Sequence, residues 1–242
     1  MTLSKASEDR TIYPEEERVG EDIVQRWIVE LLRPLVERWL AQRGEPCFVG
    51  ADQFIYFEQF NPRRYVAPDV YVLPGVAADT PVRSWKVWET GVVPSFALEV
   101  VSSDWQKDYR EAPGEHELLG TRELVIFDPR FEERREGRRF QRYVRSGDRL
   151  ELAEHGNLPL LYSEVLGVWL RAVGEGSRLR LRLAESRDSA ILFPTAEEAE
   201  RRAKEAERQA KEAERQAKEA ALERIAELEA ELRRRGEGSS AG

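Results

Sequence analysis

Apolar residues recur every three or four positions between Gly20 and Arg43, which predicts a long amphipathic helix near the start of the chain. The positions that carry this pattern are Ile23, Trp27, Leu31, Leu32, Leu35, Val36 and Trp39. Pro34 lies inside the pattern. Because proline has no backbone N–H and its ring crowds the preceding turn, we expect the helix to be kinked or divided there.

Short apolar and β-branched runs follow the helix and predict the strands of a sheet. They cover residues 46–57, expected as a strand pair or one long strand, and residues 68–73, 96–102 and 124–129. The last run is apolar over four residues, which is typical of a strand in the centre of a sheet. Residues 105–119 can form a helix, although Pro113-Gly114 is expected to interrupt it.

Two antiparallel hairpins are predicted in the second half of the chain. One covers residues 138–152 with a turn at 146–148, and the other covers residues 167–183 with a turn at 174–176. The order of helix, strands, helix, strand and hairpins predicts an α/β fold, in which a mixed sheet is flanked by helices and followed by hairpins.

The last fifth of the chain repeats a seven-residue pattern, which predicts a long C-terminal helix. Residues 196–223 spell AEEAERR, AKEAERQ, AKEAERQ and AKEAALE, with alanines at alternating steps of four and three. This is the seam of a coiled coil, and after a one-residue slip near Ala220 it continues through Ile225, Leu228 and Leu232. Two alternatives stay open: self-association through this seam, or a lone helix stabilised by Glu–Lys pairs four residues apart. The expected domains are a flexible N-terminus (1–19), a globular domain (20–194), a coiled-coil helix (195–235) and a disordered tail (236–242).

Composition narrows the class of protein. The 242 residues fit one domain and an appendage, and no run is apolar enough for a signal peptide or a membrane span, so we expect a soluble, cytoplasmic protein. A single cysteine, Cys47, excludes an intramolecular disulfide and a CxxC metal site. The net charge of −8 disfavours indiscriminate coating of nucleic acid. It leaves open a nuclease that uses a local basic patch.

Two carboxylates within apolar strands are the candidate chemistry. Asp69 lies in Pro-Asp-Val-Tyr-Val-Leu and Glu99 in Phe-Ala-Leu-Glu-Val-Val-Ser. Buried acids are costly unless a partner compensates them, and carboxylate oxygens are the ligands that Mg²⁺ and Mn²⁺ prefer. The carbonyl of Val100 can turn toward an ion held by Glu99. The same pattern also fits hydrogen-bonded structural acids, so spacing alone leaves both interpretations open.

Four further segments occur in a characteristic order, namely NPRRYVAPDV (61–70), PSFALEVVS (94–102), ELLGTRELVIFDP (117–129) and LYSEVLGVWL (161–170). Together they resemble the bacterial Uma-two family of restriction endonuclease-like proteins. The resemblance covers about residues 20 to 235 and implies the PD-(D/E)xK restriction endonuclease-like fold. It implies Asp69, Glu99 and the carbonyl of Val100 as ligands of Mg²⁺ or Mn²⁺, and DNA as the partner.

The sequence departs from the family's pattern at the catalytic lysine. Val101 occupies the position of the lysine in the PD-(D/E)xK motif. Many family members carry a lysine four residues after an Asp on the next helix instead, and aligning that Asp with Asp108 puts Ala112 at the lysine position. Lys107 is the nearby ammonium that can substitute. The family's acid or histidine on the first helix has Glu21 as its closest counterpart.

We therefore predict a metal-dependent endonuclease that hydrolyses DNA phosphodiester bonds, with Asp69, Glu99 and Lys107 in catalytic roles. The alternative is a catalytically impaired binding or scaffold protein that associates through its coiled coil. A homo-oligomer is expected, and the C-terminal helix is the candidate means of association. Asp52 is a further site candidate, whereas Cys47, His116 and His155 are interpreted as a core, a surface-helix and a loop residue. The arginines of residues 134–145 are interpreted as a solvated face or a DNA contact.

Overall fold

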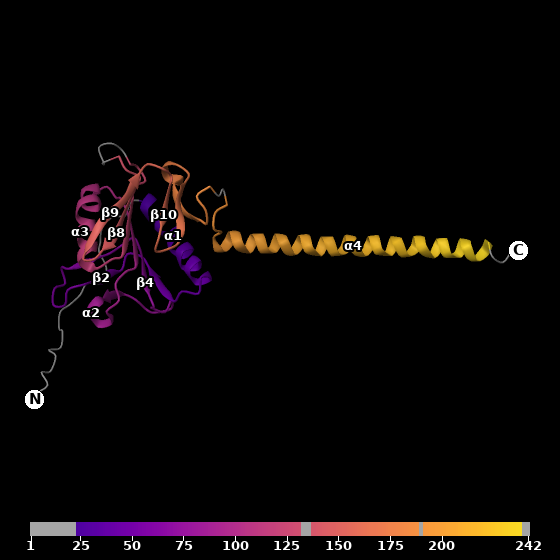
Figure 1. The fold of residues 1–242 in the computed structure, drawn as a ribbon, viewed down its shortest axis with the longest axis horizontal. Helices are drawn as coiled ribbons and strands as arrows, with labels where there is room; N and C mark the ends of the chain where they lie inside the picture. The colour runs from indigo at the N-terminus through magenta and orange to yellow at the C-terminus, as the bar shows by residue number, and fades with distance from the viewer. Residues whose placement is uncertain (1–22, 132–136, 189–190, 239–242) are drawn as a thin grey trace, which may run out of the picture. The chain divides into compact units, whose positions relative to one another are not determined.

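The computed structural model describes residues 23–131, 137–188 and 191–238. Backbone contacts divide the chain after Phe193 into two compact units, a globular unit and the C-terminal helix. The globular unit holds a mixed sheet flanked by helices, with antiparallel hairpins, and this confirms the predicted fold class (Figure 1).

A six-stranded sheet forms the centre of the globular unit, in the order β1-β4-β6-β7-β8-β9. Strands β6 and β7 pair in parallel and the other neighbours pair antiparallel. The strands are β1 (Cys47–Gly50), β4 (Val70–Pro74), β6 (Phe96–Val100), β7 (Glu123–Phe127), β8 (Phe140–Ser146) and β9 (Arg149–Gly156). Strand β7 is wholly buried, as expected for a central strand.

One face of this sheet packs against helix α1 and a small second sheet. Helix α1 (Ile23–Gln42) runs through Pro34 without being divided there. The second sheet has the order β10-β11-β12, from strands β10 (Leu160–Ser163), β11 (Val168–Val173) and β12 (Arg180–Ala184), with the short helix η3 (Gly176–Arg178) before β12. Alternate residues of β4 and β6 supply this core, namely Val70, Val72, Phe96, Leu98 and Val100. The predicted second hairpin is confirmed as β11 and β12.

The opposite face is covered by helices η1 (Lys107–Glu111) and α3 (Ala112–Leu119), and by a third sheet ordered β3-β2-β5. Its strands are β2 (Phe54–Tyr56), β3 (Tyr65–Val66) and β5 (Ser84–Lys86), and the short helix α2 (Val87–Thr90) follows. Figure 1 shows α3 on one side of β8 and β9, with α1 and β10 on the other. The expected strand at 46–57 is thus divided into β1 and β2, which belong to different sheets.

The helix after β6 is continuous, and the expected interruption at Pro113-Gly114 is wrong. Pro113 lies in the first turn of α3, where its missing N–H is tolerated. The turn before it is a π-turn, in which the N–H of Ala112 bonds the carbonyl of Lys107, five residues back. Such a turn holds one residue more than an α-turn and is frequent at functional sites.

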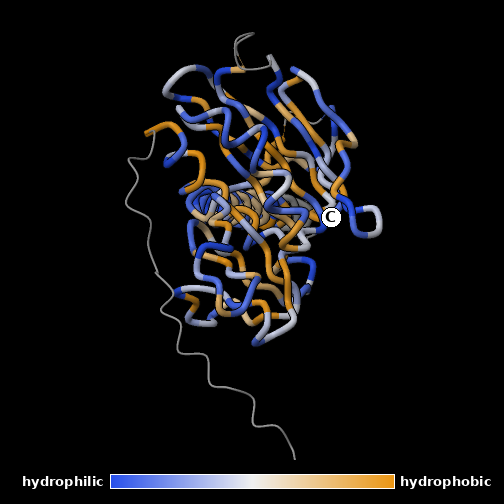
Figure 2. The backbone as a smooth tube through the Cα atoms, turned by 90° about the vertical axis from the view of Figure 1, so that its left-hand side faces the viewer, coloured by the Kyte–Doolittle hydropathy of each residue, from blue (hydrophilic) through white to orange (hydrophobic). Residues whose placement is uncertain are grey.

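Helix α4 (Ala196–Gly238) is one uninterrupted helix. It begins with a capping box, since the Thr195 N–H donates to Glu198 and the Glu198 N–H donates to the Thr195 hydroxyl. Figure 2 shows that apolar and polar residues are interleaved along the strands of the globular unit. Within the described ranges, no helix is long and apolar enough to cross a membrane.

Candidate active site

Three acids lie in a row across the ends of β1, β4 and β6. Val70 pairs with Leu98, so one further step of this antiparallel register places Asp69 opposite Glu99. Asp52 follows β1, and its N–H donates to the Pro68 carbonyl at 3.0 Å, which holds it beside the residue that precedes Asp69. Residues directly opposite in antiparallel strands have Cβ atoms about 5 Å apart. Three carboxylates in adjacent positions repel one another, which is unfavourable without a cation.

Asp69 immediately precedes β4, and its buried carboxylate is held by two neutral donors. Gln25 on α1 donates from Nε2 to Oδ1 at 2.7 Å, and the Val100 N–H donates to Oδ2 at 2.5 Å. Burial raises the pKa of Asp69 well above its usual value, and the charge of Glu99 raises it further. Burial and the charge of Glu99 therefore both disfavour the ionised form of Asp69, and a nearby cation would favour it.

Gln25 is a residue of the candidate site that the sequence analysis did not identify. The resemblance gave Glu21 as the closest counterpart of the family's acid or histidine on the first helix, but Glu21 lies outside the described residues. In the helix that the sequence predicts from Gly20, Gln25 comes one turn after position 21. That spacing is the signal that could have identified it.

Glu99 lies on β6 and contacts a buried histidine. Its Oε1 is 2.9 Å from His116 Nε2, and His116 Nδ1 is 2.8 Å from the Thr121 hydroxyl. Burial raises the pKa of Glu99 well above its usual value, and the charge of Asp108 adds to this effect. The ammonium of Lys107 acts in the opposite direction and lowers it.

The interpretation of His116 as a surface residue is wrong, because its side chain is wholly buried. Burial lowers its pKa to about 3, so the ring is neutral near pH 7. A neutral imidazole has one donor and one acceptor. When Glu99 is ionised it can only accept, so Nε2 donates to its carboxylate and Nδ1 accepts from the Thr121 hydroxyl. His116 orients Glu99 without adding a charge.

Lys107 and Asp108 lie on the π-turn beside Glu99. Lys107 is exposed, and its ammonium lowers the pKa of both Glu99 and Asp108. Asp108 accepts hydrogen bonds from the N–H and the hydroxyl of Ser102, at 2.7 and 3.0 Å. These bonds fasten the turn to the end of β6, which keeps Lys107 within electrostatic reach of Glu99.

Asp52 lies in the loop between β1 and β2 and not on a strand as expected. Its φ of 61° is in the left-handed region, which Asp tolerates better than most residues. The loop lies beside the residue that precedes Asp69, because the Asp52 N–H donates to the Pro68 carbonyl at 3.0 Å. The charge of Asp52 contributes to raising the pKa of Asp69, Glu99 and Tyr71. It therefore belongs to the same electrostatic cluster.

Comparison with known proteins places the chain among nuclease-like proteins. The model of the Uma2 family, described as "Putative restriction endonuclease", matches residues 13–184. The chain belongs to this family. The chain is also similar to a solved structure, a "putative nuclease belonging to DUF820" from Anabaena variabilis ATCC 29413, at 13% identity and a TM-score of 0.42. That match covers 59% of this chain and 73% of the other. No curated protein matches this chain.

The Uma2 resemblance implies a divalent cation. The carboxylates of the site fit a cation that takes few of its ligands from the protein and the others from water. Among the described residues, no group of three or more His, Cys, Asp or Glu side chains could hold a metal ion. Mg²⁺, however, is commonly bound by one or two carboxylates and keeps several waters. Asp69 and Glu99 are apposed acids whose mutual repulsion a cation relieves, and each bonded carboxylate oxygen retains a lone pair.

Two of the arginines considered as DNA contacts are engaged within the Uma2 domain. Arg142 is buried and forms ion pairs with Glu123 at 3.6 Å and Glu164 at 3.1 Å. Arg145 donates to the carbonyls of Thr121 and Glu117 at 3.0 and 2.6 Å. These contacts remove Arg142 from a solvated face and tie Arg145 to the end of α3, and DNA contact by this stretch stays a prediction. Arg134 and Arg135 of the same stretch lie outside the described residues.

Proposed function

We propose that this protein is a metal-dependent endonuclease that hydrolyses DNA phosphodiester bonds. The observation that carries the proposal is the apposition of Asp69, which is buried, and Glu99, which is largely buried, two acids with raised pKa values on neighbouring strand ends. Membership of the Uma2 family, described as "Putative restriction endonuclease", supports the choice of reaction and of DNA.

In this proposal Asp69, Glu99 and the carbonyl of Val100 hold Mg²⁺ or Mn²⁺. Bound there, the cation would supply a positive charge for the phosphate and an acidified water as nucleophile. Gln25 and the Val100 N–H fix Asp69, and His116 fixes Glu99. Lys107 would stabilise the negative charge that develops on the phosphate in the transition state.

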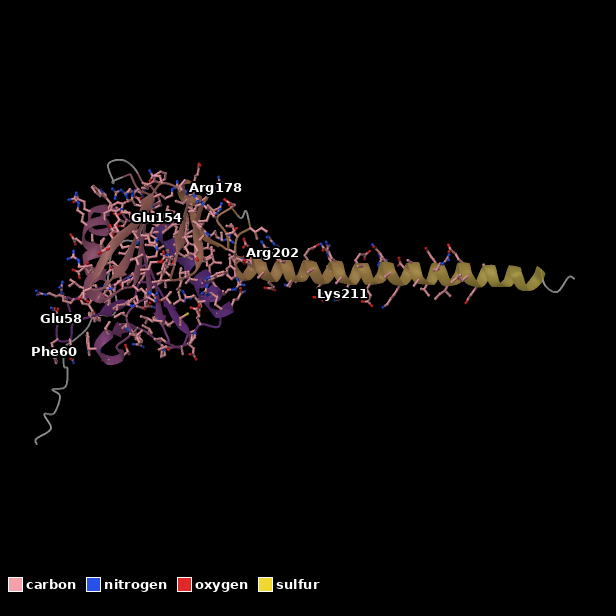
Figure 3. The ribbon with its side chains drawn as sticks, viewed as in Figure 1. Glu58, Phe60, Glu154, Arg178, Arg202 and Lys211 are labelled. Carbon is pink, nitrogen blue, oxygen red and sulfur yellow. The ribbon has the colours of Figure 1, made fainter. Side chains whose placement is uncertain are left out.

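A nicking assay on supercoiled plasmid with Mn²⁺ tests the proposal. Asp69→Asn and Glu99→Gln should each lower the nicking rate at least 10²-fold, the scale for removing a preorganised group. Glu58→Gln is the matched control, because this exposed carboxylate (Figure 3) lies on the surface and should be dispensable. Calorimetry should show that both site variants have lost Mn²⁺ binding. Unchanged nicking and unchanged Mn²⁺ binding by Asp69→Asn would refute the site.

The role of Lys107 is tested by comparing turnover with metal binding. A group that acts on the transition state affects the rate far more than the binding of metal or substrate. Lys107→Ala should lower nicking about 10²–10³-fold and leave Mn²⁺ binding intact. Lys211→Ala on α4 is the control, since it removes an ammonium from the exposed helix. Nicking that is equal in Lys107→Ala and the wild type would remove this residue from the site.

A second candidate function is a non-catalytic binding or scaffold protein on the same fold. It is favoured by Ala112, which stands where the resemblance implies a lysine. Ala112→Lys distinguishes the two candidates, because restoring the ammonium should accelerate a slow nuclease. If neither the wild type nor Ala112→Lys nicks plasmid although both bind Mn²⁺, the scaffold function is favoured.

A further inference from the structure

Helix α4 exposes an apolar cluster toward its C-terminal half. Leu222, Ile225 and Leu228 are 66%, 52% and 44% exposed. These are large aliphatic side chains one turn apart on a single helix, and no described residue of the helix covers them. Covering them with a partner contributes about 25 cal/mol per Å² of apolar surface removed from water. The cluster is therefore the main source of binding free energy along α4.

The charges beside the seam differ systematically between its two flanks. The alanines from 199 to 217 occupy positions a and d of the heptad, and after the one-residue slip near Ala220 Ile225 and Leu228 occupy them. In this assignment, position e is Glu at 200, 207, 214 and 229. Position g is Arg at 202 and 224 and Gln at 209 and 216. One flank is thus acidic, and the other is basic or neutral. Figure 3 shows Arg202 and Lys211 extending from the helix into solvent.

Parallel pairing places the two flanks of neighbouring helices against each other. A g residue then meets the e residue five positions later on the partner, which pairs Arg202 with Glu207, Gln209 with Glu214 and Arg224 with Glu229. Antiparallel pairing would instead put e beside e, and so glutamate beside glutamate. In an antiparallel pair that overlaps over its full length, the Leu/Ile cluster of each helix would face the alanine-rich N-terminal half of the other helix.

We propose that α4 pairs with α4 of a second copy of this chain as a parallel, in-register two-stranded coiled coil. The apolar cluster provides affinity, and the Arg–Glu pairs set orientation and register. Exposed ion pairs are worth only about 0.2–1 kcal/mol each, so their role is selection more than affinity. This inference does not depend on nuclease activity.

Light scattering of the full chain is the first test. The wild type should have twice the 27.9 kDa mass of one chain, and Ile225→Asp/Leu228→Asp should be monomeric. Leu158→Asp is the control, because it makes the same change at an exposed leucine of the globular unit and should leave the mass unchanged. A monomeric wild type, or a dimer that survives the double substitution, would overturn the proposal.

Orientation is tested by a disulfide. In a Cys47→Ser background, Ala206→Cys at a seam position should form a covalent dimer on oxidation, because parallel in-register helices place the two thiols together. A non-covalent dimer that does not cross-link would show the opposite orientation or another register.

Exchanging the charges at positions g and e tests the proposed Arg–Glu pairs. Arg and Glu both favour the helix, so the substitutions should leave α4 helical. Arg202→Glu/Arg224→Glu should weaken the dimer about tenfold, and adding Glu207→Arg/Glu229→Arg should restore it. Weakening without restoration would overturn the pairing proposed here.

Discussion

Glu123 and the Asp69–Glu99 pair are buried acids on neighbouring strands, but their surroundings differ. The Glu123 carboxylate accepts hydrogen bonds from the Ser163 hydroxyl and from the N–H groups of Glu164 and Val165. The guanidinium of Arg142 lies 3.6 Å away. Burial raises the pKa of Glu123, and every one of these neighbours lowers it.

Asp69 and Glu99 have the opposite balance. The donors that the structure records at their side-chain oxygens are neutral, namely Gln25 and the Val100 N–H at Asp69, and His116 and the Asp69 N–H at Glu99. Their nearest charged neighbours are largely other acids, which raise the pKa values further. Glu123 is thus stabilised by the fold, whereas the proposed cation would supply the positive charge that the pair lacks. This contrast separates a structural acid from a site acid, which spacing in the sequence does not.

The largest expected effect is on stability at Glu123. Glu123→Ala would leave the Ser163 hydroxyl and the N–H groups of Glu164 and Val165 without their acceptor, and it would remove the most buried of the three acids that pair with Arg142. Such a change typically costs about 3–5 kcal/mol of unfolding free energy. Urea denaturation measures it, and Glu154→Ala is the control, because Glu154 is an exposed partner of the same Arg142 and should cost under about 1 kcal/mol. If Glu123→Ala and Glu154→Ala lowered the unfolding free energy equally, Glu123 would not be the structural acid described here.

The sequence predicted those features that depend on local pattern. The apolar runs placed α1, β4, β6 and β7 correctly, and the acids within two of these runs identified Asp69 and Glu99 as candidates. Their apposition follows from a strand register that only the folded sheet defines. Whether they hold a metal remains a prediction.

The sequence did not predict the partners of these acids, for physical reasons. His116 is flanked by Glu115 and Glu117, which favours a surface position, and its burial comes from packing against β6 across the π-turn. Glu123 begins its strand beside Arg122, where a polar residue is ordinary. Its ligands come from Ser163 and Arg142, 40 and 19 positions away, so no local pattern reports them.

An intermediate effect is expected from removing the donor to Glu99. Residues that orient metal ligands typically contribute 10–100-fold to metal affinity. His116→Ala should therefore weaken Mn²⁺ binding by about this factor in calorimetry, and His116→Gln, which can still donate from its amide, should lose less. Circular dichroism confirms that the variants are folded. Wild-type Mn²⁺ affinity in folded His116→Ala would mean that Glu99 needs no orienting partner.

The smallest effect is a gain in stability from Asp69→Asn without metal. The substitution removes one of two repelling charges and keeps both hydrogen bonds if the Gln25 amide turns over, because the introduced amide can then accept from the Val100 N–H and donate to Gln25. The gain should be on the order of 1 kcal/mol near pH 8. At Glu123 the corresponding change is expected to destabilise, so the sign itself separates the two environments.

The pH dependence of this gain follows from the direction of the pKa shifts. The folded pKa values of Asp69 and Glu99 are raised above 3.8 and 4.5, so the folded wild type takes up protons at a higher pH than the unfolded chain does. Holding both carboxylates ionised in the folded state lowers the free energy of unfolding of the wild type. This loss is present above the folded pKa values and disappears as the pH falls toward the unfolded pKa values. The advantage of Asp69→Asn should therefore shrink between pH 8 and about pH 4 in EDTA. Mn²⁺ should reverse it by raising the Tm of the wild type alone. An Asp69→Asn protein that is less stable than the wild type at pH 8 in EDTA would place Asp69 with Glu123, as a structural acid.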